Sequence, residues 1–207
     1  ARVMTLVAGA AVSQYPASVM QCVKGPAELD KIAREGRCGM LKTVDESMVP
    51  GSDVANMSIL GYDPKKYYTG RGALEALSMG IPFGHDDVAY RCNLVAIENG
   101  KMKDFSAGHI TSEEGAELFK SLQEKYPMLN FYPGVSYRNV IMFPGGKGAD
   151  STAPHDIVNQ VVDPYLPQGE DADILMKAMV AASDVFENHP VNKKRIAEGK
   201  TPATTIW

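Results

Sequence analysis

A serine hydroxyl stands directly after a Pro-Gly turn, at the start of a short apolar segment. Ser52 follows Pro50-Gly51, and the apolar residues at 54–60 predict a helix that ends before Gly61. A helix start carries unpaired N–H groups and a partial positive charge, which favour an alkoxide, a phosphate ester or an incoming phosphate group. Ser52 is therefore a candidate nucleophile for phosphoryl transfer. Serine is also a preferred N-cap residue, and Asp53 suits a first turn, so simple helix capping explains the same residues.

The composition describes an ordinary globular protein and limits its partners. The 207 residues are 44% hydrophobic and 22% charged, with a formal net charge of -4 and a sequence pI of about 5.6. This acidic balance argues against a nucleic acid or an anionic membrane surface as partner, because either needs a basic excess. A small anionic ligand stays open, since it needs only a few well-placed Arg, Lys and His side chains.

Cysteine usage and hydropathy favour a cytoplasmic protein. The three cysteines, Cys22, Cys38 and Cys92, are odd in number and widely spaced, so they indicate neither a disulfide framework nor a zinc site. No segment approaches the roughly 20 apolar residues that span a bilayer, and the N-terminus lacks a signal-peptide pattern. We therefore expect a cytoplasmic location and no membrane partner. The sequence leaves a homo-oligomer open.

Helix and strand signals alternate in the first part of the chain. Residues 3–7 and 40–44 predict short strands, and residues 29–35 predict a helix that ends at Gly36. A further helix is predicted from about residue 73 to residue 79, before Gly80. This alternation is typical of an α/β core.

The pattern changes at residue 88. Residues 88–97 and 101–105 predict two strands joined by Asn99-Gly100, the strongest hairpin signal in the chain. Later signals predict a helix from the capping box at 111–114 to about residue 125, strands at 130–132 and 137–143, a Gly- and Pro-rich loop at 144–154, helices at 174–186 and 190–199, and a new strand starting at Ile206-Trp207. We therefore predict residues 1–87 as part of an α/β core, residues 88–200 as an inserted α+β domain, and residues 201–207 as a return towards the core.

Six segments in a fixed order carry a family resemblance. They are residues 30–39, 51–64, 68–76, 104–111, 153–157, and 189–192 together with Ile206-Trp207. These segments resemble the archaeal-type cofactor-independent phosphoglycerate mutases of the alkaline phosphatase superfamily, over roughly the first half of a family member. The resemblance implies part of an alkaline-phosphatase-like core that carries a smaller inserted α+β substrate domain.

The resemblance also implies an activity. Members interconvert 3-phosphoglycerate and 2-phosphoglycerate, in glycolysis and gluconeogenesis, without a bisphosphoglycerate cofactor. They use two divalent metal ions, such as Mn²⁺ or Mg²⁺, and a phosphoserine intermediate. Ser52 matches the nucleophile and is also a metal ligand by this comparison. The chemistry is consistent with a serine, because a metal ion lowers the pKa of its hydroxyl and a metal pair can hold both the attacking and the leaving oxygen.

The inserted part of a family member holds the phosphoglycerate, so its polar residues are candidates for substrate binding. They are Arg91, Asn93, His109, Arg138, His155 and Asp156. Arginine suits phosphate or carboxylate because its planar fork donates two parallel hydrogen bonds. His155 beside Asp156 also offers acid–base chemistry to the glycerate hydroxyl. Taken singly, each of these residues is explained by an ordinary surface position, and it is their place in the matching motifs that favours a functional role for Arg138, His155 and Asp156.

Two departures from the family concern the metal site. The family follows its first strand with an Asp-Gly pair whose carboxylate holds a metal ion, and Ala10-Ala11 stands in that place here. The remaining Asp and His ligands of the family lie in a C-terminal half beyond Trp207. Ser52 alone cannot hold a metal pair, so we expect the 207-residue chain by itself to be inactive and the activity to belong to a longer polypeptide. Two alternatives stay open: another phosphoryl-transfer or phosphatase activity of the superfamily, and a metal-less fragment that binds phosphate esters.

Overall fold

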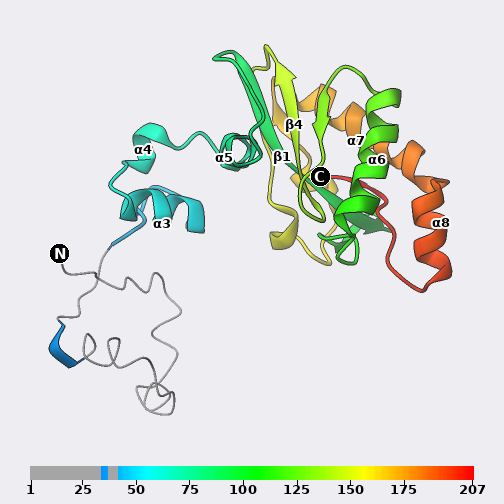
Figure 1. Cartoon of the computed structure of the whole chain (residues 1–207), viewed down its shortest axis with the longest axis horizontal. Helices are drawn as coiled ribbons and strands as arrows, with labels where there is room; N and C mark the ends of the chain where they lie inside the picture. Colours follow the sequence, from blue (N-terminus) through cyan, green and yellow to red (C-terminus); the bar gives the residue numbers. More distant parts are fainter. Residues whose placement is uncertain (1–33, 37–41) are drawn as a thin grey trace. The chain divides into compact units, whose positions relative to one another are not determined.

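The computed structural model describes residues 34–36 and 42–207. The expected strand at 3–7, most of the expected helix at 29–35 and the substitution at Ala10 lie outside the described residues. The chain divides into two compact units, Ala1–Thr69 and Gly70–Trp207, which are described separately (Figure 1). Within the described part of the chain, no helix is long and apolar enough to cross a membrane.

The described part of the first unit is built from two short helices. Helix α3 (Ser52–Ile59) ends at Leu60 and is followed by Gly61 at φ 88°, as its apolar pattern predicts. Helix α4 (Pro64–Tyr67) begins where the Asp63 carboxylate accepts a hydrogen bond from the Lys65 N–H. The strand predicted at 40–44 is wrong for its described residues 42–44, which precede a turn at Asp45 and pair with no described strand.

The second unit contains an antiparallel sheet with the strand order β2-β1-β4-β3, and β7 also pairs with β1. Its strands are β1 (Asp87–Glu98), β2 (Lys101–Asp104), β3 (Asn130–Tyr132), β4 (Arg138–Pro144) and β7 (Thr205–Ile206). The predicted hairpin is confirmed, because Asn99 and Gly100 join β1 to β2 with φ values of 51° and 70°. The strand predicted to start at Ile206 is present as part of β7, whose Ile206 pairs with Leu94 of β1.

Helices cover both faces of this sheet (Figure 1). On one face, Leu94 of β1 and Ile141 of β4 pack in the main core with helices α6 (Ser112–Lys125) and α7 (Ala172–Glu187). Helix α8 (Pro190–Ala197) adds Val191 to the same core. The capping box predicted at the start of α6 is present, with Thr111 and Glu114 bonding to each other's backbone N–H.

Helix α5 (Arg71–Ser78) covers the opposite face, where Ala76 and Ile81 pack with Val140 and Met142 of β4. The helix approaches β1 so closely that a Cβ at Gly72 would lie 1.9 Å from the carbonyl oxygen of Ala89. This contact assigns α5 to the second unit, which begins at Gly70. The expected domain boundary after residue 87 therefore differs from this division, because the sequence pattern of α5 does not reveal which sheet it packs on.

The Gly- and Pro-rich segment after β4 is less irregular than its composition predicts. It contains β5 (Ala149–Asp150), which pairs with β6 (Gln168–Gly169) in a second, two-stranded sheet. Two short 3-10 turns, η2 (Pro154–Asp156) and η3 (Asp163–Tyr165), follow along the chain. This segment carries His155 and Asp156, so its local order decides where these two side chains lie.

Candidate functional site

Ser52 is exposed and is the first residue of α3, whose N-cap is Gly51. Capping by the Ser52 hydroxyl is therefore wrong as an explanation for this serine, because the capping position belongs to a glycine that has no side chain. The first turn is instead held by Asp53, whose carboxylate accepts hydrogen bonds from the Val54 N–H at 3.0 Å and from the Tyr68 hydroxyl. Ser52 thus presents an exposed hydroxyl at the positive end of a helix.

The described residues do not complete a metal site around Ser52. Within residues 34–36 and 42–207, no three His, Cys, Asp or Glu side chains lie together in a way that could hold a metal ion. The ligand set that the family resemblance implies therefore does not fit the described part of the chain, and Ser52 is the single member of it that the structure places.

The sheet places three of the six predicted substrate residues on one face. Arg91 and Asn93 are two residues apart on β1 and therefore lie on the same face of the sheet. Arg91 pairs with Val140 of β4 and Asn93 pairs with Arg138, so Arg138 lies on this face as well. The Arg91 guanidinium lies 3.3 Å from the carboxylate of Glu75 on α5. Strand register, fixed by the hydrophobic pattern of both strands, therefore positions these residues.

Positive charge gathers around Arg91. Burial lowers the pKa of Arg91, Glu75 opposes this effect, and the nearby cations Arg71 and Arg138 lower the pKa further. The three arginines repel one another, and at Arg91 the Glu75 carboxylate offsets part of this repulsion. A dianionic phosphate ester or a carboxylate would relieve this repulsion.

Two aromatic rings join these strand residues to the loop residues. The Tyr137 ring lies 5.3 Å from the Arg138 guanidinium and 6.4 Å from the His109 ring. The Phe105 ring lies 5.7 Å from Tyr137 and 6.2 Å from the His155 ring. We call Arg91, Asn93, His109, Arg138, His155 and Asp156, together with Phe105 and Tyr137, the basic cluster.

The members of the basic cluster differ in exposure and in what they offer. His109 and Arg138 are exposed, and the side chains of His155 and Asp156 are 46% and 63% exposed. The His155 Nε2 lies 3.6 Å from an Asp156 carboxylate oxygen, which is within ion-pair range but longer than a hydrogen bond. Asn93 is buried and donates to the Phe105 carbonyl oxygen at 3.1 Å, which gives it a supporting contact.

Sequence reasoning did not name Phe105 or Tyr137. Both stand beside predicted residues, Phe105 within the segment 104–111 and Tyr137 next to Arg138. Aromatic residues at strand ends are common core residues, so neither has a chemical signature of its own. Their position beside motif residues is the one signal that could have indicated them.

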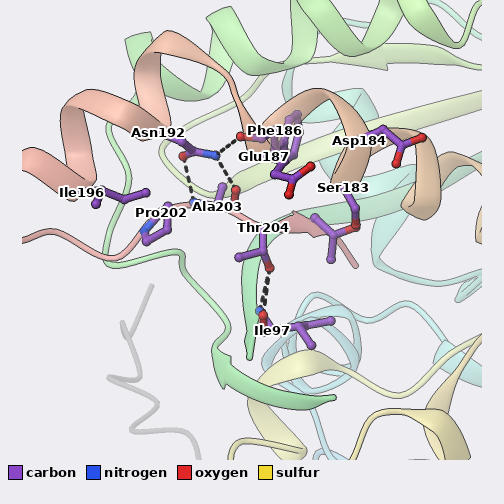
Figure 2. A pocket seen from close by; sticks show the side chains of 11 residues that line it. Ile97, Ser183, Asp184, Phe186, Glu187, Asn192, Ile196, Pro202, Ala203 and Thr204 are labelled. Carbon is purple, nitrogen blue, oxygen red and sulfur yellow. Dashed lines mark hydrogen bonds between the residues drawn. The ribbon is translucent and has the colours of Figure 1, made fainter. Parts of the chain in front are cut away.

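The groove shown in Figure 2 lies away from the basic cluster. It has a volume of about 470 Å³ and is lined by residues of α7, α8 and the segment 202–205, and none of the six predicted substrate residues lines it. Its Asn192 and Thr204 side chains are occupied by hydrogen bonds to Phe186, Ala203 and Ile97. Asp184 and Glu187 make the groove acidic, so it suits a phosphate ester poorly.

The comparison with solved structures supports the fold class. A mixed α/β structure with this topology resembles a cofactor-independent phosphoglycerate mutase from Thermoplasma acidophilum, with a TM-score of 0.57 and 27% sequence identity over 76% of this chain and 45% of that chain. The likeness confirms the predicted fold class and is consistent with an alkaline-phosphatase-like fold.

The sequence comparisons define the family. Residues 33–192 match the family model described as 2,3-bisphosphoglycerate-independent phosphoglycerate mutase. A protein of that name from Methanothrix thermoacetophila is 52% identical over 188 residues, which cover 91% of this chain and 48% of the relative, and one from Thermococcus kodakarensis is 37% identical over 86% of this chain and 46% of the relative. The chain belongs to this family, and it spans about half the length of these curated relatives.

Proposed function

We propose that this chain is the N-terminal part of a phosphoglycerate mutase that interconverts 3-phosphoglycerate and 2-phosphoglycerate. The observation that supports the proposal most strongly is the basic cluster, in which residues from β1, β4 and two loops gather around Phe105 and Tyr137. The small-molecule partner is phosphoglycerate, which carries one carboxylate and one phosphate. Two divalent metal ions, Mn²⁺ or Mg²⁺, a cytoplasmic location and a place in glycolysis belong to the same proposal for the complete protein.

The arginines and histidines of the basic cluster have separate roles in this proposal. Arg91 and Arg138 bind the anionic groups of phosphoglycerate, because a guanidinium donates two parallel hydrogen bonds to a carboxylate or phosphate. His109 adds a further hydrogen bond from its exposed ring. His155, next to Asp156, accepts the proton that the glycerate hydroxyl must lose when it takes up the phosphoryl group.

Ser52 accepts the phosphoryl group in this proposal. The bond between phosphorus and the glycerate oxygen breaks as the bond from phosphorus to the Ser52 Oγ forms, and the glycerate oxygen takes up a proton. The phosphoryl group then passes from Ser52 to the neighbouring glycerate hydroxyl, and Ser52 regains a proton. The α3 N-terminus stabilises the negative charge on the esterified serine.

A coupled mutase assay on the complete protein tests the proposal, with incorporation of labelled phosphate into the protein as a second measurement. Ser52→Ala abolishes both turnover and labelling. Arg138→Ala raises KM for 3-phosphoglycerate by about tenfold or more, because a charge-assisted hydrogen bond contributes about 1.5–3 kcal/mol. Lys120→Ala, which removes an exposed cation of α6, is the matched control and leaves KM unchanged.

Other outcomes of this assay contradict the proposal in distinguishable ways. Release of inorganic phosphate without formation of 2-phosphoglycerate identifies a phosphatase, since a shared nucleophile does not determine the acceptor. Binding of 3-phosphoglycerate without turnover, with Ser52→Ala equal to wild type, identifies a binding protein. Equal KM values for Arg138→Ala and wild type exclude the basic cluster as the substrate site.

A further inference from the structure

The loop that carries His109 has an unusual backbone. Ala107, Gly108 and His109 follow one another with φ values of 48°, 65° and 51°, in the left-handed region. Only glycine adopts this region without strain, and single left-handed residues are the rule elsewhere. A run that includes an alanine and a histidine persists only where the surrounding structure compensates for it.

Asp104 holds the loop from within. Its carboxylate accepts hydrogen bonds from the Ser106 N–H at 2.7 Å, the Ser106 hydroxyl at 2.6 Å and the Gly108 N–H at 3.0 Å. The Ser106 hydroxyl oxygen in turn accepts from the His109 N–H at 3.2 Å. Burial acts to raise the pKa of Asp104, but the bonds from Ser106 and Gly108 outweigh it and hold the pKa below its usual value.

Arg195 of α8 holds the loop from the other side. One of its terminal nitrogens donates to the carbonyl oxygens of Ala107 at 2.8 Å and Gly108 at 3.1 Å. The other terminal nitrogen lies 2.5 Å from the Glu114 carboxylate, and Nε donates to the Thr201 carbonyl at 3.0 Å. The residue is 1% exposed, so these bonds form away from competing water.

The fit at Gly108 shows how closely Arg195 and the loop are packed. A Cβ at this position would lie 2.9 Å from the Cβ of Thr201 and 3.2 Å from the guanidinium of Arg195. A side chain at position 108 would therefore clash with Thr201 and crowd Arg195, so this position requires glycine both for its positive φ and for space.

We propose that Asp104 and Arg195 are positioning residues for substrate binding, which together fix the left-handed loop so that the exposed His109 ring stays beside Tyr137 in the basic cluster. This inference rests on the proposed function. A partly buried anion, Asp104, and a buried cation, Arg195, hold the same three-residue run, and the His109 side chain that leaves it is exposed, so the network extends beyond what packing of the loop requires. Such preorganisation makes a binding group effective because its position does not have to be fixed when the ligand arrives.

The test compares steady-state kinetics of the complete protein with variants at both anchors. Arg195→Lys keeps a charge but cannot reach the Ala107 and Gly108 carbonyls together with Glu114, and Asp104→Asn places an amide group opposite the Gly108 N–H. Both raise KM for 3-phosphoglycerate by about fivefold to tenfold with little change in kcat, as His109→Ala does. Combined with His109→Ala, neither substitution raises KM further, because the group it positions is gone.

Asn192→Ala is the matched control. Asn192 is a buried residue of the same helix, and its side chain binds the Phe186 and Ala203 backbone without touching residues 104–109. This variant lowers the midpoint of thermal unfolding and leaves KM at the wild-type value. A merely structural role for Arg195 would lower the active fraction, and hence the apparent kcat, as the control does.

Three outcomes overturn the inference. The first is a wild-type KM in both Arg195→Lys and Asp104→Asn. The second is a rise of KM in Asn192→Ala as large as the rise in these two variants. The third is a further rise of KM, equal to that of the single variant, when either substitution is added to His109→Ala. If Arg195→Lys does not fold, Asp104→Asn alone decides. If KM rises in Arg138→Ala but not in the loop variants, this inference is contradicted and the proposed function stands. If the wild-type protein neither binds nor converts phosphoglycerate, both are contradicted.

Discussion

Replacing Asp171 by asparagine should destabilise the second unit through one glycine-rich loop. Asp171 is 4% exposed, and its carboxylate accepts from the Tyr90 hydroxyl at 2.5 Å, the Lys147 N–H at 2.9 Å and the Gly148 N–H at 2.8 Å. It therefore ties β1 to the loop that leads from β4 to β5. In Asp171→Asn the amide oxygen can keep these contacts only as neutral hydrogen bonds, and the new NH₂ group faces the Lys147 N–H.

The magnitude follows from the three hydrogen bonds. Charge-assisted hydrogen bonds are roughly twice as strong as neutral ones, so each bond loses about 1 kcal/mol and the variant loses about 3 kcal/mol of unfolding free energy. For a unit of this size the midpoint of thermal unfolding falls by about 10 °C.

The loss should also depend on pH. Burial acts to raise the pKa of Asp171, but the bonds from Tyr90, Gly148 and Lys147 outweigh it and hold the pKa below the ordinary 3.8. A carboxyl group with a lowered folded-state pKa stabilises the fold above its unfolded-state pKa, and this contribution is lost as the pH falls below about 3.8. The difference between wild type and Asp171→Asn should therefore shrink in that range.

Urea denaturation at pH 7 and at several values down to pH 3 measures both effects. Asp173→Asn is the matched control, since Asp173 is an exposed residue in the same first turn of α7 and should change stability by less than about 0.5 kcal/mol. Equal losses for the two variants at pH 7 would refute the reasoning. A loss for Asp171→Asn that stays constant down to pH 3 would refute the assignment to the ionised carboxylate.

Three further predictions concern helices α5, α6 and α8 of the second unit. Gly72→Ala should cost about 2–3 kcal/mol in urea denaturation, because its Cβ would meet the Ala89 carbonyl oxygen and push α5 away from β1. Thr111→Ala should cost about 1 kcal/mol by the same measurement, through loss of the capping box of α6. The His189 Nδ1 accepts a hydrogen bond from the Val191 N–H at the start of α8, and burial lowers the pKa of this histidine. The stability of the fold should therefore fall as the pH drops below about 6.5. His189→Asn should keep the cap and lose this pH dependence.

The elements of the second unit could be predicted well from local signals. The hairpin at Asn99-Gly100, the capping box at Thr111 and the glycine after α5 each have a specific backbone requirement, and the structure confirms all three. These signals depend on neighbouring residues alone, so they predict local structure without knowledge of the tertiary structure. The strand at 40–44 had only a short apolar run in its favour, and such a run does not distinguish a strand from other buried segments.

The contacts that build the site could not be predicted in the same way. The sequence places Arg195 and His109 far apart, and nothing in a basic helix face indicates that one arginine is buried against the carbonyls of a distant loop. The family resemblance indicates the six polar residues of the basic cluster, and their meeting around Tyr137 depends on strand register and loop backbone together. Register depends on which strands pair, and that is a property of the whole sheet.

Strand pairing and a hydrogen-bonded loop thus position different residues of the basic cluster, and the two should respond differently to mutation. Arg91 and Arg138 stand on paired strands, so their spacing persists as long as β1 and β4 remain paired. His109 stands on a loop that depends on hydrogen bonds from two charged side chains, Asp104 and the buried Arg195, which a single conservative substitution can disturb. Changes at these ions should therefore weaken binding at the histidine while the arginines still attract the anion. Changes in strand pairing should remove both, because Tyr137, against which His109 packs, precedes β4 directly.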